Sequence, residues 1–360
     1  MKKNQLVTLG KHIDILSGCA FPSSGFNRNN GVPLIRIRDI LSGKTETYYE
    51  GSYDLKYLIK KGDLLVGMDG DFNREYWKGT DALLNQRVCK ITPNPETLDK
   101  NFLYHFLQKE LDKIHATTDV VTVKHLSVKK IQDIKIRLPS LKEQKRIAAI
   151  LDKADAIRQK REQAIKLADD FLRAKFLEMF GTPANNIHRF PKGTIRDLVD
   201  SVNYGTSAKA SIDSGEYPIL RMGNITYQGR WDFTDLKYLD LSVKEKDKYL
   251  VKEGDLLFNR TNSKELVGKT AVYEEDRPMA FAGYLIRVRP NSIGNNYYIS
   301  GYLNSIHGKI TLMNMCKSIV GMANINAQEL QNIEILIPPK HLQDEYEICL
   351  LYTSPSPRDA

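Results

Sequence analysis

The stretch LPSLKEQKRIAAILDKAD, residues 138–155, marks the change from a strand-like segment to a long helix. Pro139 ends the extended run before it. Ser140 followed by Glu143 is the pattern of a capping box, in which the hydroxyl and the carboxylate satisfy free backbone N–H groups at a helix start. Neither Pro nor Gly follows until residues 180–183, FGTP, which predict a left-handed glycine cap and a stop. At 1.5 Å per residue this helix is about 60 Å long.

Apolar residues recur along this helix at spacings of three and four, which predicts one apolar stripe. A single small domain cannot cover a helix of that length, so we expect the stripe to pack against another helix, in this chain or in a second one. Several stripe positions are Ala, which permits close approach of a partner helix, and Arg161 interrupts the stripe. The stripe includes Ile147, Ile150, Ala154, Ile157, Ala164, Ala168, Phe171 and Phe176.

The chain also repeats itself, which points to duplication of one unit. Four stretches match in the same order in both halves. PLIRIRDI from residue 33 matches PILRMGNI from 218, and YLIKKGDLLVG from 57 matches YLVKEGDLLFN from 249. RVCKITPN from 87 matches YLIRVRPN from 284, and IQDIKIRLP from 131 matches LQNIEILIP from 330. Their offsets of 185, 192, 197 and 199 rise steadily, as small loop insertions would produce.

Each copy consists mostly of short β-type runs punctuated by turns, with helical character near its end at 98–115 and 295–314. The fold class is therefore α+β, with two pseudo-repeated domains joined by a long coiled-coil helix. The second copy begins the same helix at 337–347, but SPSPRD from residue 354 cannot continue it. We expect a truncated second helix and a non-native or frameshifted tail; a natural short tail is the alternative. The predicted segments are 1–139, 140–181, 182–338, 339–348 and 349–360.

Composition indicates an anionic partner and a reducing compartment. The 360 residues carry a formal charge of +9, with a pI near 9.1, which favours nucleic acid before membrane. No signal peptide or membrane-spanning run is expected. The four scattered cysteines form no CxxC pair, so we expect a cytoplasmic protein. They are Cys19, Cys89, Cys316 and Cys349.

Motifs that would carry catalysis are not recognised in the sequence. No Asn/Asp-Pro-Pro-Tyr/Phe methyltransferase motif occurs. SKELVGKT, residues 263–270, resembles a phosphate-binding loop, but Ser263 stands where the first glycine is needed. Gly268–Thr270 is better interpreted as a hairpin turn. No HxH or HExxH spacing predicts a metal site, and His125 and His307 are interpreted as surface or packing residues. We expect no catalytic centre, no metal and no cofactor in this chain.

The candidate DNA-binding residues lie in matching loops of the two copies. Arg commonly pairs with guanine and Asn with adenine, Asp accepts from the cytosine amino group, and Lys suits phosphates. For the residues after the two GDLL turns, the alternative to DNA contact is that they simply form polar hairpin tips, and the sequence favours neither. For the repeat-equivalent arginines 36 and 221, an internal salt bridge is the alternative. The candidates are Arg36, Asp69, Asp71, Asn73, Arg74, Lys124, Arg221, Asn259, Arg260, Asn262, Lys264 and Lys317; Lys129 and Lys130 are at least as readily explained as a solvated face.

The chain resembles the DNA specificity subunits of type I restriction–modification systems. The resemblance covers about residues 5–348 and rests on residues 138–155, MFGTPANN at 179–186, both GDLL turns and IPPKHLQDEYE at 337–347. It implies two target recognition domains that bind the halves of a split double-stranded DNA site. It implies an antiparallel helix pair that spaces the domains and docks two DNA methyltransferase subunits, with restriction/translocase subunits joining the complex. S-adenosylmethionine, ATP and Mg would then belong to the partners, and the truncated second helix puts one methyltransferase contact in doubt.

Two other classes of function remain as alternatives. A duplicated protein-binding scaffold, with charge serving only solubility, would show no steep salt dependence of DNA binding. An autonomous enzyme would need a catalytic constellation that the sequence does not display, and binding of S-adenosylmethionine or ATP by the isolated chain would support it.

Overall fold

The computed structural model describes residues 5–118, 124–316 and 322–353, which form two compact units. Unit 1 comprises Met1–Gln159 and unit 2 comprises Lys160–Ala360, so the boundary falls within one long helix. Among the described residues, no helix combines the length and the apolar character needed to cross a membrane.

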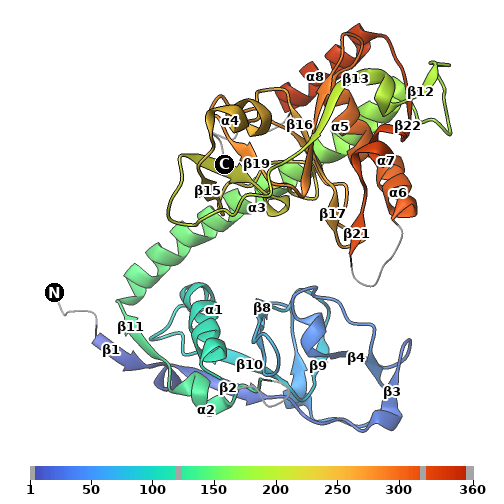
Figure 1. Cartoon of the computed structure of the whole chain (residues 1–360). Helices are drawn as coiled ribbons and strands as arrows, with labels where there is room; N and C mark the ends of the chain where they lie inside the picture. The colour runs from blue at the N-terminus through green and yellow to red at the C-terminus, as the bar shows by residue number, and fades with distance from the viewer. Residues whose placement is uncertain (1–4, 119–123, 317–321, 354–360) are drawn as a thin grey trace. The chain divides into compact units, whose positions relative to one another are not determined.

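Unit 1 is built from short strands, single-turn 3-10 helices and three α-helices (Figure 1). Its strands are β1 Gln5–Thr8, β2 Ile13–Ser17, β3 Phe26–Asn27, β4 Val32–Ile35, β5 Tyr48–Tyr49, β6 Leu58–Ile59, β7 Leu64–Gly67, β8 Arg74–Tyr76, β9 Ala82–Leu84, β10 Val88–Pro93 and β11 Lys135–Leu138. Its helices are η1 Leu9–Lys11, η2 Ser23–Gly25, η3 Ile37–Asp39, η4 Leu55–Tyr57, α1 Lys100–Ala116, α2 Val128–Gln132 and the first part of α3 Leu141–Phe180.

The strands of unit 1 form three sheets. One is antiparallel, in the order β2-β10-β7-β8. The second, in the order β3-β5-β4-β9-β6, contains the parallel pair β4–β9, and the third joins β1 to β11. Helix α1 packs on the first sheet because Leu103, Leu107 and Leu111, spaced by four, are fully buried in the same core cluster as Leu64 and Ile91.

Unit 2 uses the same kinds of elements. Its strands are β12 Lys192–Thr194, β13 Val199–Tyr204, β14 Tyr217–Leu220, β15 Lys237–Leu239, β16 Leu256–Asn259, β17 Thr261–Asn262, β18 Thr270–Val272, β19 Ala280–Phe281, β20 Leu285–Pro290, β21 Ala323–Asn324 and β22 Glu334–Leu336. Its helices are the rest of α3, η5 Ile195–Leu198, η6 Met222–Asn224, α4 Val243–Tyr249, α5 Asn296–Asn304, α6 Ile306–Met315, α7 Ala327–Gln331 and α8 Lys340–Thr353.

The sheets of unit 2 repeat those of unit 1, which confirms two pseudo-repeated α+β domains. The antiparallel sheet runs β13-β20-β16-β18, the sheet β15-β14-β19 contains the parallel pair β14–β19, and β12 pairs with β22. The turns match as well: the Asp63 carboxylate accepts from the Lys60 N–H, and the Asp255 carboxylate accepts from the Lys252 N–H, both at 2.9 Å. The predicted hairpin at Gly268 is present, since β16 pairs with β18 and Gly268 has a φ of 77°.

Helix α3 has 40 residues, and its two ends differ in how closely they follow the sequence pattern. At the end, Gly181 takes a φ of 66° and its N–H donates to Leu177, so the predicted left-handed cap is confirmed. At the start, the Ser140 hydroxyl accepts from the Glu143 N–H at 3.4 Å. The predicted second bond of the capping box, from the Ser140 N–H to the Glu143 carboxylate, is not formed. That carboxylate instead accepts two bonds from the Arg146 guanidinium, at 2.7 and 2.9 Å, so this half of the prediction was wrong.

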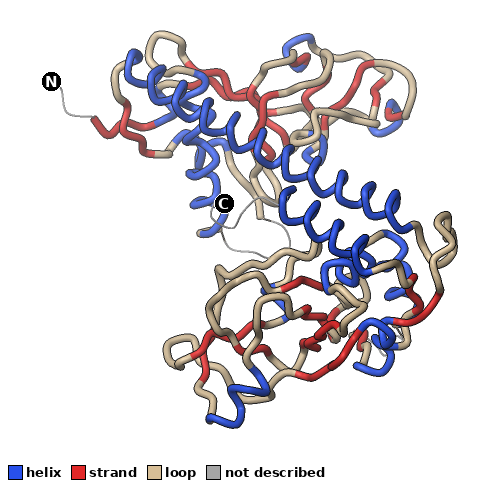
Figure 2. Tube along the Cα trace, turned by 90° about the horizontal axis from the view of Figure 1, so that it is seen from above, coloured by secondary structure: helices blue, strands red, loops and turns tan. Residues whose placement is uncertain are grey.

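Helix α8 packs beside the C-terminal part of α3 (Figure 2). Tyr346 stands edge-on to Phe176 and Phe180, with ring centroids 5.2 and 5.8 Å apart. The expected helix partner is therefore present for the last turns of α3, whereas Ile150 and Ile157 are exposed. Helix α8 continues to Thr353, beyond the predicted end at residue 348; residues 354–360 of the predicted tail lie outside the described residues.

The helical stretch predicted at 295–314 is two helices rather than one. Ser305 separates α5 from α6 because its backbone is extended, with φ −67° and ψ 162°, and its hydroxyl accepts from the Gly308 N–H at 3.1 Å. Ser is a strong N-cap residue, so its side chain starts a new helix there. A Cβ atom at position 308 would lie 2.1 Å from the Tyr302 carbonyl oxygen, so only glycine fits there.

A buried glutamine anchors the start of α3 in unit 1 and of α8 in unit 2. The Gln144 amide is completely buried; its Nε2 donates to the carbonyls of Thr97 and Pro139, and its Oε1 accepts from the Asp99 N–H at 2.8 Å. Gln343 occupies the equivalent place, and its Nε2 donates to Ile293 and Pro338 at 2.9 Å. The amide therefore ties the strand before the helix, and the loop before α1 or α5, to the helix itself.

We predict that Gln144→Leu destabilises unit 1 by about 2–4 kcal/mol, because three partly buried backbone groups lose their partner at once. Gln343→Leu should cost less, since the Gln343 Oε1 has no hydrogen-bond partner among the described residues. Thermal unfolding of the full chain measures both effects, with the exposed Gln159→Leu on α3 as control. Equal losses for all three variants would contradict this role of the amides.

Candidate nucleic-acid interface

In unit 1, three segments that are distant in the sequence meet at the end of strand β7. The Met68 N–H donates to the Arg87 carbonyl at 2.8 Å, and the Leu126 N–H donates to the Met68 carbonyl at 2.7 Å. The Gly70 N–H donates to the Lys124 carbonyl at 3.1 Å. We call this meeting point the unit 1 junction; it comprises Met68–Gly70, Arg87 and Lys124–Leu126.

Three polar side chains gather at the unit 1 junction. The Asp69 carboxylate lies 2.6 Å from Nδ1 of His125 and 3.4 Å from Nε of Arg87. The Arg87 Nη1 is also 3.4 Å from the His125 ring nitrogen. The Arg87 and His125 side chains are 54% and 52% exposed, so the cluster is open to a ligand.

Unit 2 builds the same junction with different side chains. The Arg260 N–H donates to the Tyr284 carbonyl at 3.0 Å, and the Ile325 N–H donates to the Arg260 carbonyl at 2.9 Å. Thr261 pairs with Asn324 in the β17–β21 ladder, and the Thr261 hydroxyl donates to the Asn324 Oδ1 at 3.0 Å. The unit 2 junction comprises Arg260–Asn262, Tyr284 and Ala323–Ile325.

Two arginines predicted to contact DNA lie across aromatic rings. The Arg74 guanidinium is 3.4 Å from the centroid of the Tyr104 ring on α1, and that of Arg260 is 4.8 Å from the Tyr204 ring on β13. Both side chains are partly buried, and stacking holds the guanidinium plane in a fixed direction. The geometry therefore presents these cations in restricted orientations.

Arg36 and Arg221 share one backbone role and differ in their side-chain contacts. Each precedes a 3-10 helix, and its N–H donates at 2.9 Å to the side chain three residues later, Asp39 or Asn224. The Arg221 guanidinium pairs with Asp235 at 2.8 Å, so the internal salt bridge that was the alternative to DNA contact is present. Arg36 lies over the Phe26 ring at 5.3 Å.

Two other candidates make contacts inside the fold. The Lys124 ammonium donates to the His115 carbonyl at 2.6 Å and so caps the end of α1. Asn259 is completely buried at the end of β16, where its amide donates to the Leu266 carbonyl at 3.4 Å. The burial of Asn259 does not support its predicted contact with DNA, because no ligand reaches it in this conformation.

The remaining candidates are dispersed over loops. Asp71 in unit 1 and Lys264 in unit 2 are exposed, and Asn73 in unit 1 is half-buried. Asn262 is half-buried in β17, where its Oδ1 accepts from the Ser263 N–H at 2.9 Å. Lys317 lies outside the described residues.

Sequence reasoning missed Arg87, His125, Tyr284 and Asn324. The repeat alignment held a usable signal, since RVCKITPN and YLIRVRPN place Arg87 opposite Tyr284. These two residues differ in type within a matched stretch, and both are exposed, Tyr284 by 55%. His125 and Asn324 could not be paired with the GDLL loops from spacing alone, because the contact joins segments about 60 residues apart.

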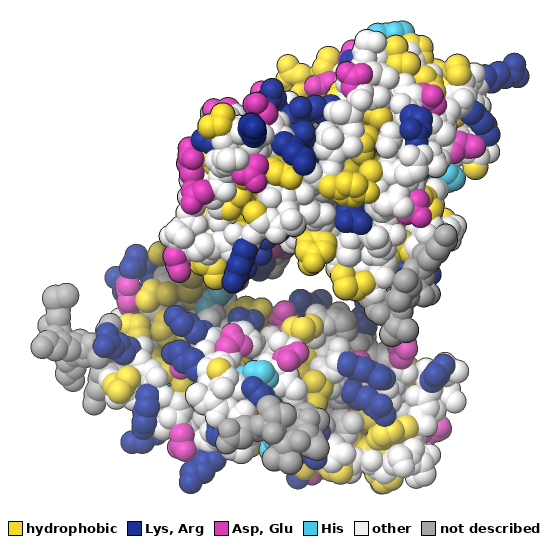
Figure 3. Space-filling view, in the orientation of Figure 1, with side chains coloured by type: hydrophobic (Ala, Val, Ile, Leu, Met, Phe, Trp, Pro, Cys, Tyr) yellow, Lys and Arg dark blue, Asp and Glu magenta, His cyan; other side chains and the backbone are white. Residues whose placement is uncertain are grey.

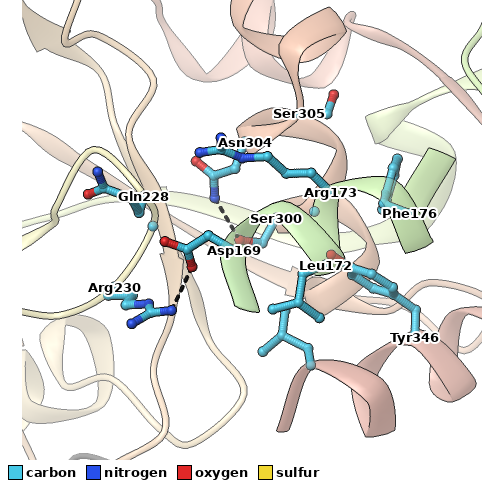
Figure 4. Close-up of a pocket in the computed structure, with 13 residues that line it drawn as sticks. Asp169, Leu172, Arg173, Phe176, Gln228, Arg230, Ser300, Asn304, Ser305 and Tyr346 are labelled. Atoms are coloured by element: carbon cyan, nitrogen blue, oxygen red, sulfur yellow. Dashed lines mark hydrogen bonds and ion pairs between the residues drawn. The ribbon is translucent and has the colours of Figure 1, made fainter. Parts of the chain in front are cut away.

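Figure 4 shows a small cavity of unit 2, about 100 Å³, between α3, α5, α8 and the loop before Trp231. Asp169 and Arg230 form an ion pair at 2.6 Å across it, and Asn304 bonds Ser300 at 3.3 Å. These contacts tie the loop to α3 and place no nucleophile beside a base in the cavity.

Charge is mixed over the visible surface, with Lys and Arg interspersed among Asp and Glu (Figure 3). Within the described ranges, no group of three or more His, Cys, Asp or Glu is placed to hold a metal ion. The junctions are the places in the two units where equivalent loops bring exposed polar side chains together.

Comparison with known proteins identifies both copies. The family profile described as "Type I restriction modification DNA specificity domain" matches residues 1–167 and again residues 190–347. The EcoBI specificity subunit of Escherichia coli is 31% identical over 373 residues, covering 95% of this chain and 77% of the relative. The EcoKI specificity subunit of Escherichia coli strain K12 is 24% identical, covering 88% and 74%. The S subunit of a type I system from M. genitalium shares the fold, with a TM-score of 0.63 at 14% identity, covering 98% of this chain and 90% of that one.

Lys309 on α6 is an unpaired cation among other cations. Its ammonium is enclosed without a hydrogen-bond partner among the described residues and lies 5.0 Å from the Tyr227 ring. Burial, followed by the nearby charges of Lys269 and Arg173, lowers the pKa of Lys309 to about 8. The fold therefore bears the cost of an enclosed charge at neutral pH.

We predict that Lys309→Met raises the thermal midpoint at pH 7 and that this advantage shrinks between pH 8 and pH 10. The pKa of Lys309 in the folded chain is lower than in the unfolded chain, so the enclosed charge destabilises the fold fully below pH 8. Above pH 8 the folded chain loses this proton while the unfolded chain still keeps it, and the destabilisation is relieved. Thermal scans across pH measure the effect, with the exposed Lys244→Met as control. A lowered midpoint at pH 7 would show instead that the ammonium is favourably bound.

Proposed function

Because the chain belongs to the type I restriction modification DNA specificity family, we propose that it is the specificity subunit of a type I restriction–modification complex. It binds a split double-stranded DNA site, one half through each unit, and directs partner subunits to that site. The single observation that carries this function is the duplicated fold, since the family profile matches each copy separately.

The partners follow from the same membership. We propose two DNA methyltransferase subunits and the restriction/translocase subunits as partners, with α3 and α8 as the docking elements for methyltransferase. Catalysis, S-adenosylmethionine, ATP and Mg then belong to those partners, and this chain supplies recognition alone. A cytoplasmic location, where such a complex meets DNA, is part of the same proposal.

The division of labour between the units is supported by their internal completeness. Each unit has its own buried core, around Leu103 and Ile91 in unit 1 and around Phe258 and Ile299 in unit 2. Each also has its own junction of loops. Because neither core borrows strands from the other unit, one recognition domain can change without rebuilding the other.

We predict that replacing residues 1–139 with the corresponding domain of another family member changes one half of the DNA site only. Methylome sequencing of cells that carry the complex measures the outcome directly. If both halves changed, or neither did, the assignment of one half-site to each unit would be wrong. As a control, residues 1–139 are replaced with the corresponding domain of a family member that recognises the same DNA site, which should leave the site unchanged.

We predict that Arg260→Ala and Arg74→Ala each weaken binding to the cognate site by about 1–3 kcal/mol, the discrimination of a good bidentate base contact. Filter binding of the full chain across a salt series separates two kinds of contact. A lost phosphate contact weakens all sequences alike and reduces the salt slope by about 1. The exposed Arg137→Ala on β11 is the matched control, and an Arg260→Ala chain that binds like this control would contradict the prediction.

A further inference from the structure

The two junctions are one position of one scaffold. The Gln86 N–H donates to the Cys19 carbonyl, as the Gly283 N–H donates to the Thr206 carbonyl, so Arg87 and Tyr284 each follow an equivalent bonded residue. The residue pairs Asp69/Thr261, Arg87/Tyr284 and His125/Asn324 have offsets of 192, 197 and 199, the same as the repeats around them. The backbone hydrogen bonds around these positions therefore correspond between the units, while all three side chains differ and only Arg87, not Tyr284, has a left-handed φ.

In unit 1 the junction holds a guanidinium in place from one side. The Asp69 carboxylate pairs with the Arg87 Nε at 3.4 Å, and Nδ1 of His125 donates to the same carboxylate at 2.6 Å, which holds Asp69 in place. A guanidinium has five N–H donors, so these contacts leave others for a ligand. Two parallel N–H donors match O6 and N7 on the major-groove edge of guanine.

Stability does not explain this arrangement. Arg87 has a φ of 72°, in the left-handed region that non-glycine residues rarely occupy. Ion pairs as exposed as Arg87–Asp69 add little to stability. A strained backbone that presents an exposed and oriented cation is typical of a functional site.

In unit 2 the junction holds an amide instead. The Thr261 hydroxyl donates to the Asn324 Oδ1 at 3.0 Å, which orients a side chain that is itself exposed. A carbonyl oxygen has two lone pairs, so Oδ1 can also accept from N6 of adenine while Nδ2 donates to N7. Tyr284, in the place of Arg87, carries no charge that would favour guanine.

We propose that each junction is the base-recognition position of its domain, with Arg87 specifying a guanine in one half-site and Asn324 specifying an adenine in the other. Asp69 positions Arg87, His125 positions Asp69, and Thr261 positions Asn324. The proposal rests on the proposed function and adds to it the residues and the bases.

The test is selection of bound duplexes from a randomised DNA pool by the full chain, followed by sequencing. We compare wild type with Arg87→Asn, because Asn tolerates the left-handed backbone but lacks the guanidinium, and with Asn324→Ala. The charge-matched and size-matched controls are the exposed Arg137→Gln and Asn185→Ala. We expect Arg87→Asn to lose about tenfold preference for guanine at one position, and Asn324→Ala to lose a similar preference for adenine in the other half.

A second measurement needs no protein variant, so a folding defect cannot affect it. Wild-type chain is bound to its selected site with 7-deazaguanine or 7-deazaadenine at the assigned position, which removes the N7 acceptor of that base. We expect about tenfold weaker binding at those positions and no change for the same substitution at other purines of the spacer.

The outcomes separate the two proposals. A wild-type chain that selects no split consensus overturns the proposed function. A wild-type chain with a split consensus that both variants retain, or whose affinity is indifferent to the 7-deaza bases, overturns the base assignment alone. Uniform loss on all sequences would show phosphate contacts and would overturn it equally.

Discussion

The buried amide of Gln144 is the constraint on which the direction of the long helix depends. A strand, a loop and a helix meet there, and each has a backbone N–H or carbonyl group that the regular secondary structure leaves without a hydrogen-bond partner. The amide supplies two donors and one acceptor to Thr97, Pro139 and Asp99. Gln343 repeats the arrangement in unit 2. Each unit therefore fixes how its helix leaves the domain by hydrogen bonds within that unit.

With the helix start fixed, the sheets can serve as a common frame for different surfaces. The order β2-β10-β7-β8 is repeated as β13-β20-β16-β18, and the two backbone bonds made by Met68 in unit 1 recur at Arg260 in unit 2. What changes are the side chains of the two junctions, since Tyr284 takes the place of the ion-paired Arg87 and the hydrogen-bonded Asn324 takes the place of His125. Two copies of one frame with different polar ends are what recognition of two different half-sites requires.

The sequence was sufficient for what depends on local pattern. The long helix, its glycine cap and the duplicated sheets follow from periodicity, turn residues and repeats, and the structure contains them. Long-range contacts were beyond such patterns: the burial of Asn259 and the cap made by Lys124 depend on segments folded against them. The break at Ser305 was missed because a serine fits both the interior of a helix and its start.

The register of the sheet explains why equal distance from the GDLL turns was misleading for the site. The Gly67 N–H donates to Asn73, whereas the equivalent Asn259 N–H donates to Lys269, so residues 68–72 correspond to the longer loop 260–268. Arg74 is then equivalent to the buried Thr270 and not to Arg260. Positions inside the longer loop therefore have no fixed counterpart, whereas positions just after β7 and β16, and on the segments that pair with them, are equivalent in both units. Arg87, Tyr284, His125 and Asn324 satisfy that condition, and a position that two domains hold in common is where a change of side chain can change the base without moving the frame.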